Sequence, residues 1–425
     1  MRRVMAIQFV VVFALFFTTE RSMPVTAQGR GGTVTVFEGA RLITGDGSAP
    51  LENAVFIVEG TRFTQVGRAG QVKIPEGASR VDLKGKTVIP AIVDSHNHVS
   101  TERAALIDQL ERKAYFGTGV VTSLGQDNTD VAFQVRNETI PNAARLRTAG
   151  RGLTAPEPGR TEAPYWVATA AEARKAVQEN AAKKVDLIKL WVDDRDGQFK
   201  KLTPDVYGPA IEEAHKLGLR VTAHIFKLED AKGLLRAGLD AFAHVPARDL
   251  DVDDEFMAML KKRPDVFLAP NLPDRGVATD MSWLADSISP AELKKLQAGA
   301  TDRPQAQQAF GIQARNLNKM NAAGVKIVLG TDGIVPWANH LEMEDMVAAG
   351  MTPAQVIVAS TRNAADLLKL TDVGTVAAGK SADFVVLDAN PLDDIKNTRK
   401  ISNVYLRGAA VNRAAIRARM VGKSE

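Results

Sequence analysis

The chain has 425 residues, a formal net charge of +4, 45% hydrophobic and 24% charged residues, and no cysteine. The lack of cysteine excludes disulfides, thiolate metal sites, iron–sulfur clusters, a cysteine nucleophile and lipidation on cysteine, so any metal has to be held by nitrogen and oxygen atoms. The composition is that of a globular chain long enough for two or three domains, and the small net charge without a basic block gives no indication of nucleic-acid binding.

Residues 1–27 have the pattern of a secretory signal peptide. Arg2 and Arg3 precede an apolar run over 4–17, and the small residues at 25–27 offer a cleavage position. The run is shorter than the roughly 20 residues of a membrane-spanning helix. We therefore expect an exported product, periplasmic or secreted, that is not attached to a membrane after signal cleavage.

The two ends of the remaining chain carry strand-like patterns. Residues 33–88 alternate apolar and polar positions between Gly and Pro residues, which predicts short antiparallel strands. The pattern returns over 371–413. We expect one small β-sandwich domain built from both segments, with a larger domain over 89–370 inserted between them.

Apolar runs alternate with amphipathic helical stretches over 89–370. Helices are predicted over 104–117, 170–183, 207–218, 229–238 and 253–262. The strand candidates are VIPAIVDSHNHV (88–99), GVVTSLG (119–125), ARLRTAG (144–150), VDLIKLWV (185–192), LRVTAHIF (219–226), LDAFAHV (239–245), DVFLAPN (265–271) and VKIVLGTDG (325–333). Eight such strands over about 250 residues are typical of a TIM (β/α)8 barrel. An open doubly wound sheet is the alternative on pattern alone, but no glycine-rich fingerprint follows the first strand.

Metal-binding residue types fall at the carboxyl ends of these strands, where barrel active sites lie. His96 and His98 are two apart on a strand, so both imidazoles point to one face. His224, His244 and Asp332 end the fifth, sixth and eighth strands, and Lys189 lies in the apolar fourth strand. Each residue alone is a weak signal, but together and in barrel order they predict a metal centre of imidazole and carboxylate ligands, which suits zinc best.

The motifs resemble the amidohydrolase superfamily. VIPAIVDSHNHV is similar to its strand-one motif, V-[LM]-P-G-[LF]-[IV]-D-x-H-x-H, except that Ala91 stands where the family usually has Gly. The resemblance continues through DLIKLWVDD, GLRVTAHI, AGLDAFAHV, VLGTDG and GTVAAGKSADFVVLDANPL, and looks closest to the imidazolonepropionase-like and Xaa-Pro dipeptidase-like branch.

The resemblance implies two divalent ions, with a role for each residue. His96 and His98 would bind the more buried ion, and His224 and His244 the second. Lys189 would carry a CO2-derived carbamate that bridges both ions, while Asp332 would be a ligand and the catalytic proton shuttle. The implied activity is hydrolysis of a C–N bond by a metal-bridged hydroxide. A mononuclear centre without the bridging lysine is the alternative.

Further residues are candidates for the substrate pocket. His340, Trp337 and Asn271 lie in loops after the seventh and eighth strands, and Arg160 is a candidate clamp for a substrate carboxylate. The run Asp193–Arg195 lies on the same side and is interpreted as solvated charge. His215 is expected to be a helix C-terminal residue and Asp383 a structural one.

The sequence therefore predicts an exported metal-dependent amidohydrolase that acts on a small amide, cyclic amide or dipeptide, and that forms a homo-oligomer. Alternatives of the same fold are a Xaa-Pro-type metallodipeptidase and a lactone or ester hydrolase. A non-catalytic relative and a periplasmic solute-binding protein are alternatives of other classes. Metal content distinguishes them from the enzyme.

Overall fold

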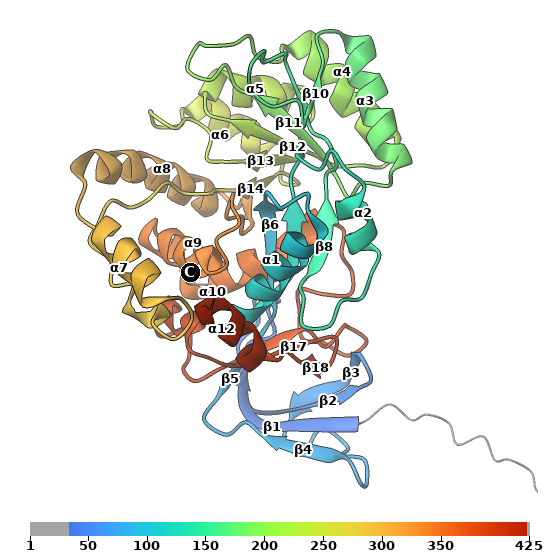
Figure 1. The fold of residues 1–425 in the computed structure, drawn as a ribbon, viewed down its shortest axis with the longest axis vertical. Coiled ribbons are helices and arrows are strands. Elements are labelled where there is room, and N and C mark those ends of the chain that lie inside the picture. Colours follow the sequence, from blue (N-terminus) through green and yellow to red (C-terminus); the bar gives the residue numbers. More distant parts are fainter. Residues whose placement is uncertain (1–33, 423–425) are drawn as a thin grey trace, which may run out of the picture. The chain divides into compact units, whose positions relative to one another are not determined.

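The computed structural model describes residues 34–422, and the predicted signal peptide lies outside these residues. Strands from both ends of the chain form one eight-stranded sheet (Figure 1). Its order is β18-β17-β16-β5-β1-β2-β3, with β4 paired to β1. The strands are β1 (Val34–Leu42), β2 (Leu51–Glu59), β3 (Arg62–Arg68), β4 (Ser79–Asp82), β5 (Thr87–Pro90), β16 (Phe384–Leu387), β17 (Ile401–Leu406) and β18 (Ala409–Ala410).

The prediction that the strands over 33–88 are antiparallel is wrong for β4, and β5, which begins at Thr87, also runs parallel to β1. β1 and β2, and β2 and β3, are antiparallel, but β4 runs parallel to β1 with Thr35 opposite Ser79. After the β2–β3 hairpin the chain crosses to the other edge of β1, and such a crossover brings the strand back in the same direction. The periodicity of a strand is the same in both directions and could not reveal this.

Aromatic side chains from both chain ends hold this sheet together. Phe37 stacks on Phe56 with ring centroids 5.0 Å apart, and Phe384 from the C-terminal segment meets Phe37 edge-to-face at 5.2 Å. All three rings are buried. The expected joining of 33–88 with 371–413 is thus observed as a single sheet. The separate β-sandwich domain, with boundaries at residues 89 and 370, stays a prediction.

The eight predicted barrel strands are present. They are β6 (Ile92–Asn97), β7 (Thr118–Ser123), β8 (Arg145–Thr148), β11 (Ile188–Val192), β12 (Val221–Ile225), β13 (Ala241–Ala243), β14 (Phe267–Ala269) and β15 (Lys326–Ile327). Paired neighbours run parallel. The N–H of Asp186 donates to Thr148 O at 2.9 Å between β8 and β11, and the N–H of Ser95 donates to Leu329 O at 3.0 Å, which joins the segment after β15 to β6. These bonds close the ring of a (β/α)8 barrel.

Helices follow the barrel strands and cover the outside of the barrel, and the last helix follows β18 of the other sheet (Figure 1). They are α1 (Arg103–Tyr115), α2 (Val131–Arg136), α3 (Ala170–Ala182), α4 (Pro204–Lys216), α5 (Leu228–Arg236), α6 (Asp254–Lys261), α7 (Pro290–Gly299), α8 (Pro304–Ala322), α9 (Ala338–Ala348), α10 (Pro353–Val358), α11 (Ala364–Leu367) and α12 (Arg413–Gly422). Short elements complete the fold: β9 (Leu153–Thr154), β10 (Tyr165–Trp166), η1 (Ser282–Leu284), η2 (Ala359–Asn363) and η3 (Ile395–Arg399).

Local signals explain where these helices begin. Thr169 and Glu172 form a reciprocal capping box at the start of α3, and proline occupies the first turn of α4, α7, α8 and α10.

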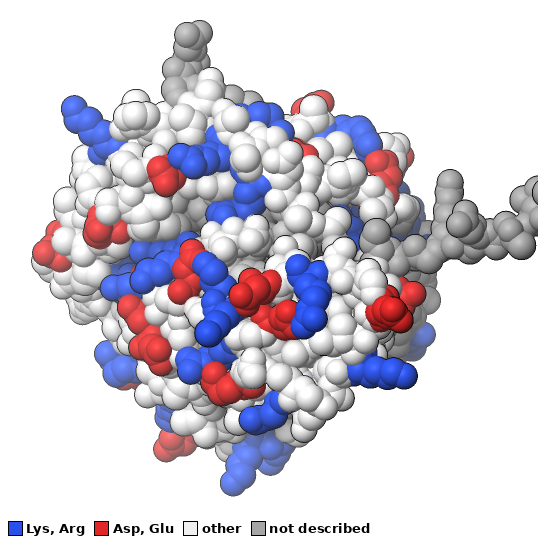
Figure 2. Space-filling model, turned by 90° about the horizontal axis from the view of Figure 1, so that it is seen from below, with Lys and Arg blue, Asp and Glu red and all other residues white. Residues whose placement is uncertain are grey.

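Among the described residues, no helix combines the length and apolar character needed to cross a membrane. On the face shown in Figure 2, basic and acidic side chains are interspersed, in keeping with 54 Lys and Arg against 50 Asp and Glu.

Candidate metal centre

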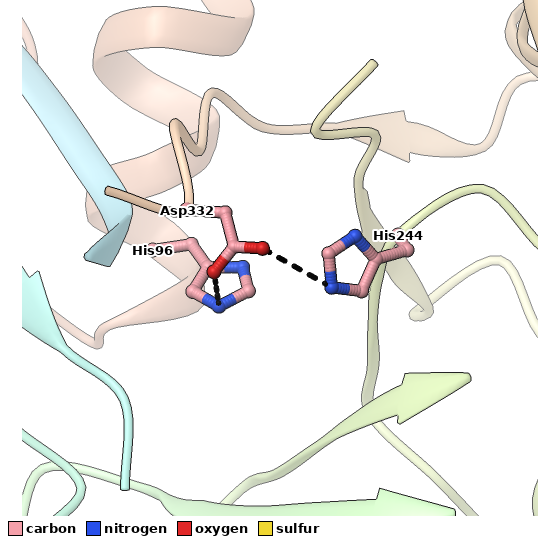
Figure 3. A group of neighbouring side chains, drawn as sticks. All are labelled: His96, His244 and Asp332. Atoms are coloured by element: carbon pink, nitrogen blue, oxygen red, sulfur yellow. Dashed lines mark ion pairs between the residues drawn. The ribbon is translucent and has the colours of Figure 1, made fainter. Parts of the chain in front are cut away.

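The predicted ligands converge at the carboxyl ends of the barrel strands. His96 lies in β6 with His98 just after it, Lys189 lies in β11 and His224 in β12, and His244 and Asp332 follow β13 and β15. His96, His244 and Asp332 each offer one ligand atom, and these atoms lie within 4.8 Å of one another (Figure 3). Parallel strands in a barrel end on one face, and this brings residues far apart in sequence to a single point.

Asp332 is the centre of this group. Its Oδ1 lies 3.1 Å from Nε2 of His96 and 3.1 Å from Nε2 of His98, and its Oδ2 lies 3.6 Å from Nε2 of His244. Burial raises the pKa of this carboxyl, but hydrogen bonds and electrostatic attraction from the imidazoles of His96, His98 and His244 outweigh burial and hold it well below its usual range. Asp332 is therefore a carboxylate anion in this position.

The backbone at two of these positions is in an unusual conformation. Asp332 has φ of 49° and His244 has φ of 137°, both in the region that favours glycine. The N–H of Asp332 donates to the carbonyl of His96 at 2.8 Å, which holds the end of the eighth strand against the first. Strained backbone of this kind persists where the surrounding structure fixes it, and it clusters at functional sites.

Lys189 lies next to this group and is fully buried. Its Nζ is 3.3 Å from Nε2 of His96 and 5.2 Å from the ring centroid of Trp191. Within residues 34–422 no ion pair is recorded for it. Burial lowers the pKa of Lys189 to about 7, so the neutral amine is well populated at neutral pH.

Nε2 of His224 faces Asp193 rather than the other predicted ligands. Its Nε2 lies 3.3 Å from Oδ2 of Asp193, while its ring centroid is 4.5 Å from that of His244. The tight group of His96, His244 and Asp332 thus does not include it. Asp193, interpreted from sequence as solvated charge, is instead a partner of a predicted ligand.

The donor set fits divalent metal ions. Burial lowers the pKa of His96 to about 3 and of His224 to about 4, and it holds that of His244 well below its usual value. These imidazoles are therefore neutral and keep a lone pair for a metal. Nε2 of His244 and Nδ1 of His98 are buried without a hydrogen-bond partner among the described residues. Neutral imidazoles with an unused nitrogen, arranged around a carboxylate, are the chemistry of a Zn-type site.

A buried ion pair between Lys113 and Asp94 lies next to the segment that carries Asp332. Nζ of Lys113, on α1, lies 3.0 Å from Oδ2 of Asp94, and both side chains are buried. Asp94 also accepts hydrogen bonds from the backbone and the hydroxyl of Thr331, at 3.2 and 2.7 Å. Sequence analysis missed Lys113. The one available signal was a lysine on the side of a helix that also carries Leu106 and Leu110.

A pocket of about 170 Å³ opens beside the metal centre. Its lining includes His98, His224 and Asp332 together with Trp191, Arg160, Glu157 and Arg195. Glu157 is 2% exposed and lies between the two arginines, 3.0 Å from Nη1 of Arg160 and 3.0 Å from Nε of Arg195. Arg160, predicted as a substrate contact, thus lines the pocket. Arg195, interpreted as solvated charge, lines it as well.

The other substrate candidates lie elsewhere. His340 is fully buried, with Nδ1 3.0 Å from the hydroxyl of Thr398, and Trp337 is buried at the start of α9. Neither belongs to the lining of this pocket, and their substrate role stays a prediction. The amide of Asn271 is in hydrogen-bond contact with Nδ1 of His96, on the side of the ring away from Asp332. His215 at the end of α4 pairs with Asp240 at 2.8 Å.

Comparisons with known proteins agree with this geometry. The sequence model of the amidohydrolase family matches residues 87–411, a range that contains every predicted ligand. Ochratoxinase of Aspergillus niger is 26% identical over 89% of this chain and 86% of its own. Imidazolonepropionase of Streptomyces coelicolor is 26% identical over 82% and 91%. The crystal structure of a candidate prolidase from Bifidobacterium longum superposes with a TM-score of 0.74 and 26% identity over 91% of this chain and 97% of that one.

Proposed function

The chain belongs to the amidohydrolase family and is a hydrolase of carbon–nitrogen bonds, and from that premise we propose that it is an exported, metal-dependent enzyme that cleaves small amides carrying a free carboxylate. The observation that carries the metal requirement is the convergence of the imidazoles of His96, His98 and His244 on the carboxylate of Asp332, with Nε2 of His244 buried there and without a hydrogen-bond partner among the described residues. An ion at this point would supply the partner that this buried nitrogen needs after the loss of water.

We assign the residues as follows. His96 and His98 would hold one divalent ion together with Asp332, and His224 and His244 would hold a second. The neutral amine of Lys189 would add to CO2 and release one proton to solvent, and the resulting carbamate would supply a further anionic oxygen ligand. The burial and low pKa of Lys189 support this role, because only the neutral amine is nucleophilic. When bound, the ions supply an activated water at neutral pH and polarise the substrate carbonyl.

The chain's own groups then handle the proton and the substrate. Asp332 lies within hydrogen-bond reach of the ligand nitrogens, and its carboxylate is placed to take a proton and deliver it to the leaving nitrogen. The pocket beside it holds the substrate, and its wall of Trp191 excludes water from one side.

The two arginines favour a substrate with a carboxylate. Arg195 donates from Nε to Glu157 and from Nη1 to Asp193, and Arg160 donates from Nη1 to Glu157. Among residues 34–422, Nη2 of both guanidinium groups has no hydrogen-bond partner. Such paired guanidinium groups recognise carboxylates. N-acyl amino acids and dipeptides, including those of Xaa-Pro type, meet this requirement. A prolidase assignment for the structural relative from Bifidobacterium longum is consistent with it.

The decisive experiment combines metal content with a paired substrate panel. We expect close to two equivalents of zinc or a similar ion per chain, and turnover of N-acetyl-L-amino acids in preference to the matching N-acetyl-L-amino acid amides. Loss of activity on chelation should be reversed by zinc and bicarbonate. A protein that binds no metal and turns over neither set would contradict the proposal, whereas equal turnover of both sets would contradict only the carboxylate preference.

A further inference from the structure

The amide of Asn271 contacts the ring nitrogen of His96 that does not face the metal centre. Nε2 of His96 lies 3.1 Å from Asp332 and 3.3 Å from Nζ of Lys189, while Nδ1 is in hydrogen-bond contact with Nδ2 of Asn271. The other amide atom, Oδ1 of Asn271, is buried and has no hydrogen-bond partner among the described residues. One half of this amide is thus engaged and the other is unused.

The position of this side chain is fixed from two sides. Asn271 follows β14 with φ of 43°, and the N–H of the next residue, Leu272, donates to both carboxylate oxygens of buried Glu342 at 3.1 and 3.2 Å. Gly330 packs directly against the amide, because a Cβ there would lie 2.6 Å from Oδ1 of Asn271. The amide therefore cannot move away from the imidazole without disturbing the barrel.

A neutral imidazole has one N–H, and its location depends on what Nε2 does. When Nε2 donates to Asp332, Nδ1 is an acceptor and needs a donor, and Nδ2 of Asn271 provides one. When Nε2 holds a metal ion, Nδ1 carries the proton and needs an acceptor. Metal-binding histidines almost always have such an acceptor on the second nitrogen.

We propose that Asn271 is a positioning residue whose amide donates to Nδ1 of His96 in the ion-free centre and turns by half a rotation to accept from it in the metal-loaded centre. The two ends of a carboxamide are nearly equal in size, so the turn needs no displacement of the loop. Because Oδ1 has no partner, the turn breaks no hydrogen bond of that atom. This inference rests on the proposed metal centre, and it adds a group that acts on the ion through His96, while a substrate contact of Asn271 stays a prediction.

Two substitutions distinguish whether the side chain at position 271 accepts a hydrogen bond from Nδ1 of His96 or donates one to it. Asn271→Gly removes the amide, and glycine tolerates the positive φ. Asn271→Asp keeps an acceptor in the same place but removes the donor, and aspartate also tolerates this backbone. We would measure the zinc affinity of the full chain by competition with a chromophoric chelator, a readout that is independent of hydrolysis.

We expect Asn271→Gly to weaken zinc binding by roughly 10- to 100-fold, and Asn271→Asp to bind zinc at least as tightly as the wild type. Equal losses in both variants would overturn the proposal, since they would assign a donor or purely structural role to the amide, and so would wild-type affinity in Asn271→Gly. Asn142 is the matched control: it has φ of 62° and accepts a hydrogen bond from the N–H of Asn412. Its Gly and Asp variants should leave zinc affinity unchanged. A wild type that binds no zinc would instead defeat the proposed function.

Discussion

Nζ of Lys189 lies 3.3 Å from Nε2 of His96, although 93 residues separate them in the sequence. The contact places an amine with a pKa near 7 among imidazoles that are also neutral. Such an arrangement is costly for a lysine that stays an ammonium ion, since within residues 34–422 no carboxylate forms an ion pair with it. It suits a lysine that is to be converted into a carbamate anion between cations.

Lys189→Ala should lower kcat/KM by at least about 100-fold, because the bridging anion is lost. A small carboxylic acid such as acetate, added at high concentration, should restore part of the activity by occupying the vacated space. The measurement is turnover as a function of acetate, with bound zinc measured in parallel. Full activity without acetate would show that no carbamate is needed.

Asp332→Asn should lower kcat by roughly 10²- to 10⁴-fold, the usual contribution of a positioned acid–base group. Asparagine tolerates the φ of 49° at this position, so the variant should fold. Circular dichroism and thermal unfolding serve as the control for folding. A folded variant that keeps wild-type kcat would rule out the proton-shuttle role.

Arg160→Gln should raise KM for N-acetyl amino acids by about 10- to 100-fold, in line with the loss of a charge-assisted hydrogen bond. Arg248→Gln is the matched control, because both arginine side chains are 42% exposed and each forms one ion pair, but Arg248 pairs with Asp196 and does not line the pocket. Equal effects of the two substitutions would remove the support for a carboxylate clamp.

Lys113→Met should lower the free energy of unfolding by about 3–5 kcal/mol, because it leaves the buried carboxylate of Asp94 without its cation. The double variant Asp94→Asn with Lys113→Met should regain part of this stability. Denaturant titration of both proteins gives the comparison. A double variant less stable than the single one would mean that Asp94 stabilises the fold mainly through Thr331.

Because of His340, we expect the free energy of unfolding to decrease in acid. Burial lowers its pKa from an ordinary value near 6.5 to about 3, so between these values the unfolded chain takes up a proton that the folded protein does not. The neutral, buried imidazole of His340 therefore contributes fully to the free energy of unfolding above pH 6.5. As the pH decreases this contribution falls, and at pH 5 it is smaller by roughly 2 kcal/mol. His340→Gln should show a smaller decrease in unfolding free energy between pH 7 and pH 5. An unchanged slope would contradict this assignment.

Much of the fold and of the ligand set could be predicted from local signals. Runs of alternating and continuous apolar residues, separated by glycine and proline, located all eight barrel strands, and the ends of those strands located His96, His98, His224, His244 and Asp332. The direction of β4 was missed, because a strand has the same side-chain period in parallel and antiparallel sheets.

The sequence by itself determined which residue types reach the centre and in what order, because these depend on position along a strand. The tertiary structure alone decided which atoms meet. Asp94 and Thr331 are 237 residues apart, and Asn271 and His96 are 175 apart, yet each pair is in hydrogen-bond contact. Arg195 was interpreted from sequence as a solvated charge, but in the structure it lines the pocket and forms an ion pair with Glu157. Such contacts follow from closure of the barrel, which brings the first strand against the eighth, and no local pattern encodes that distance.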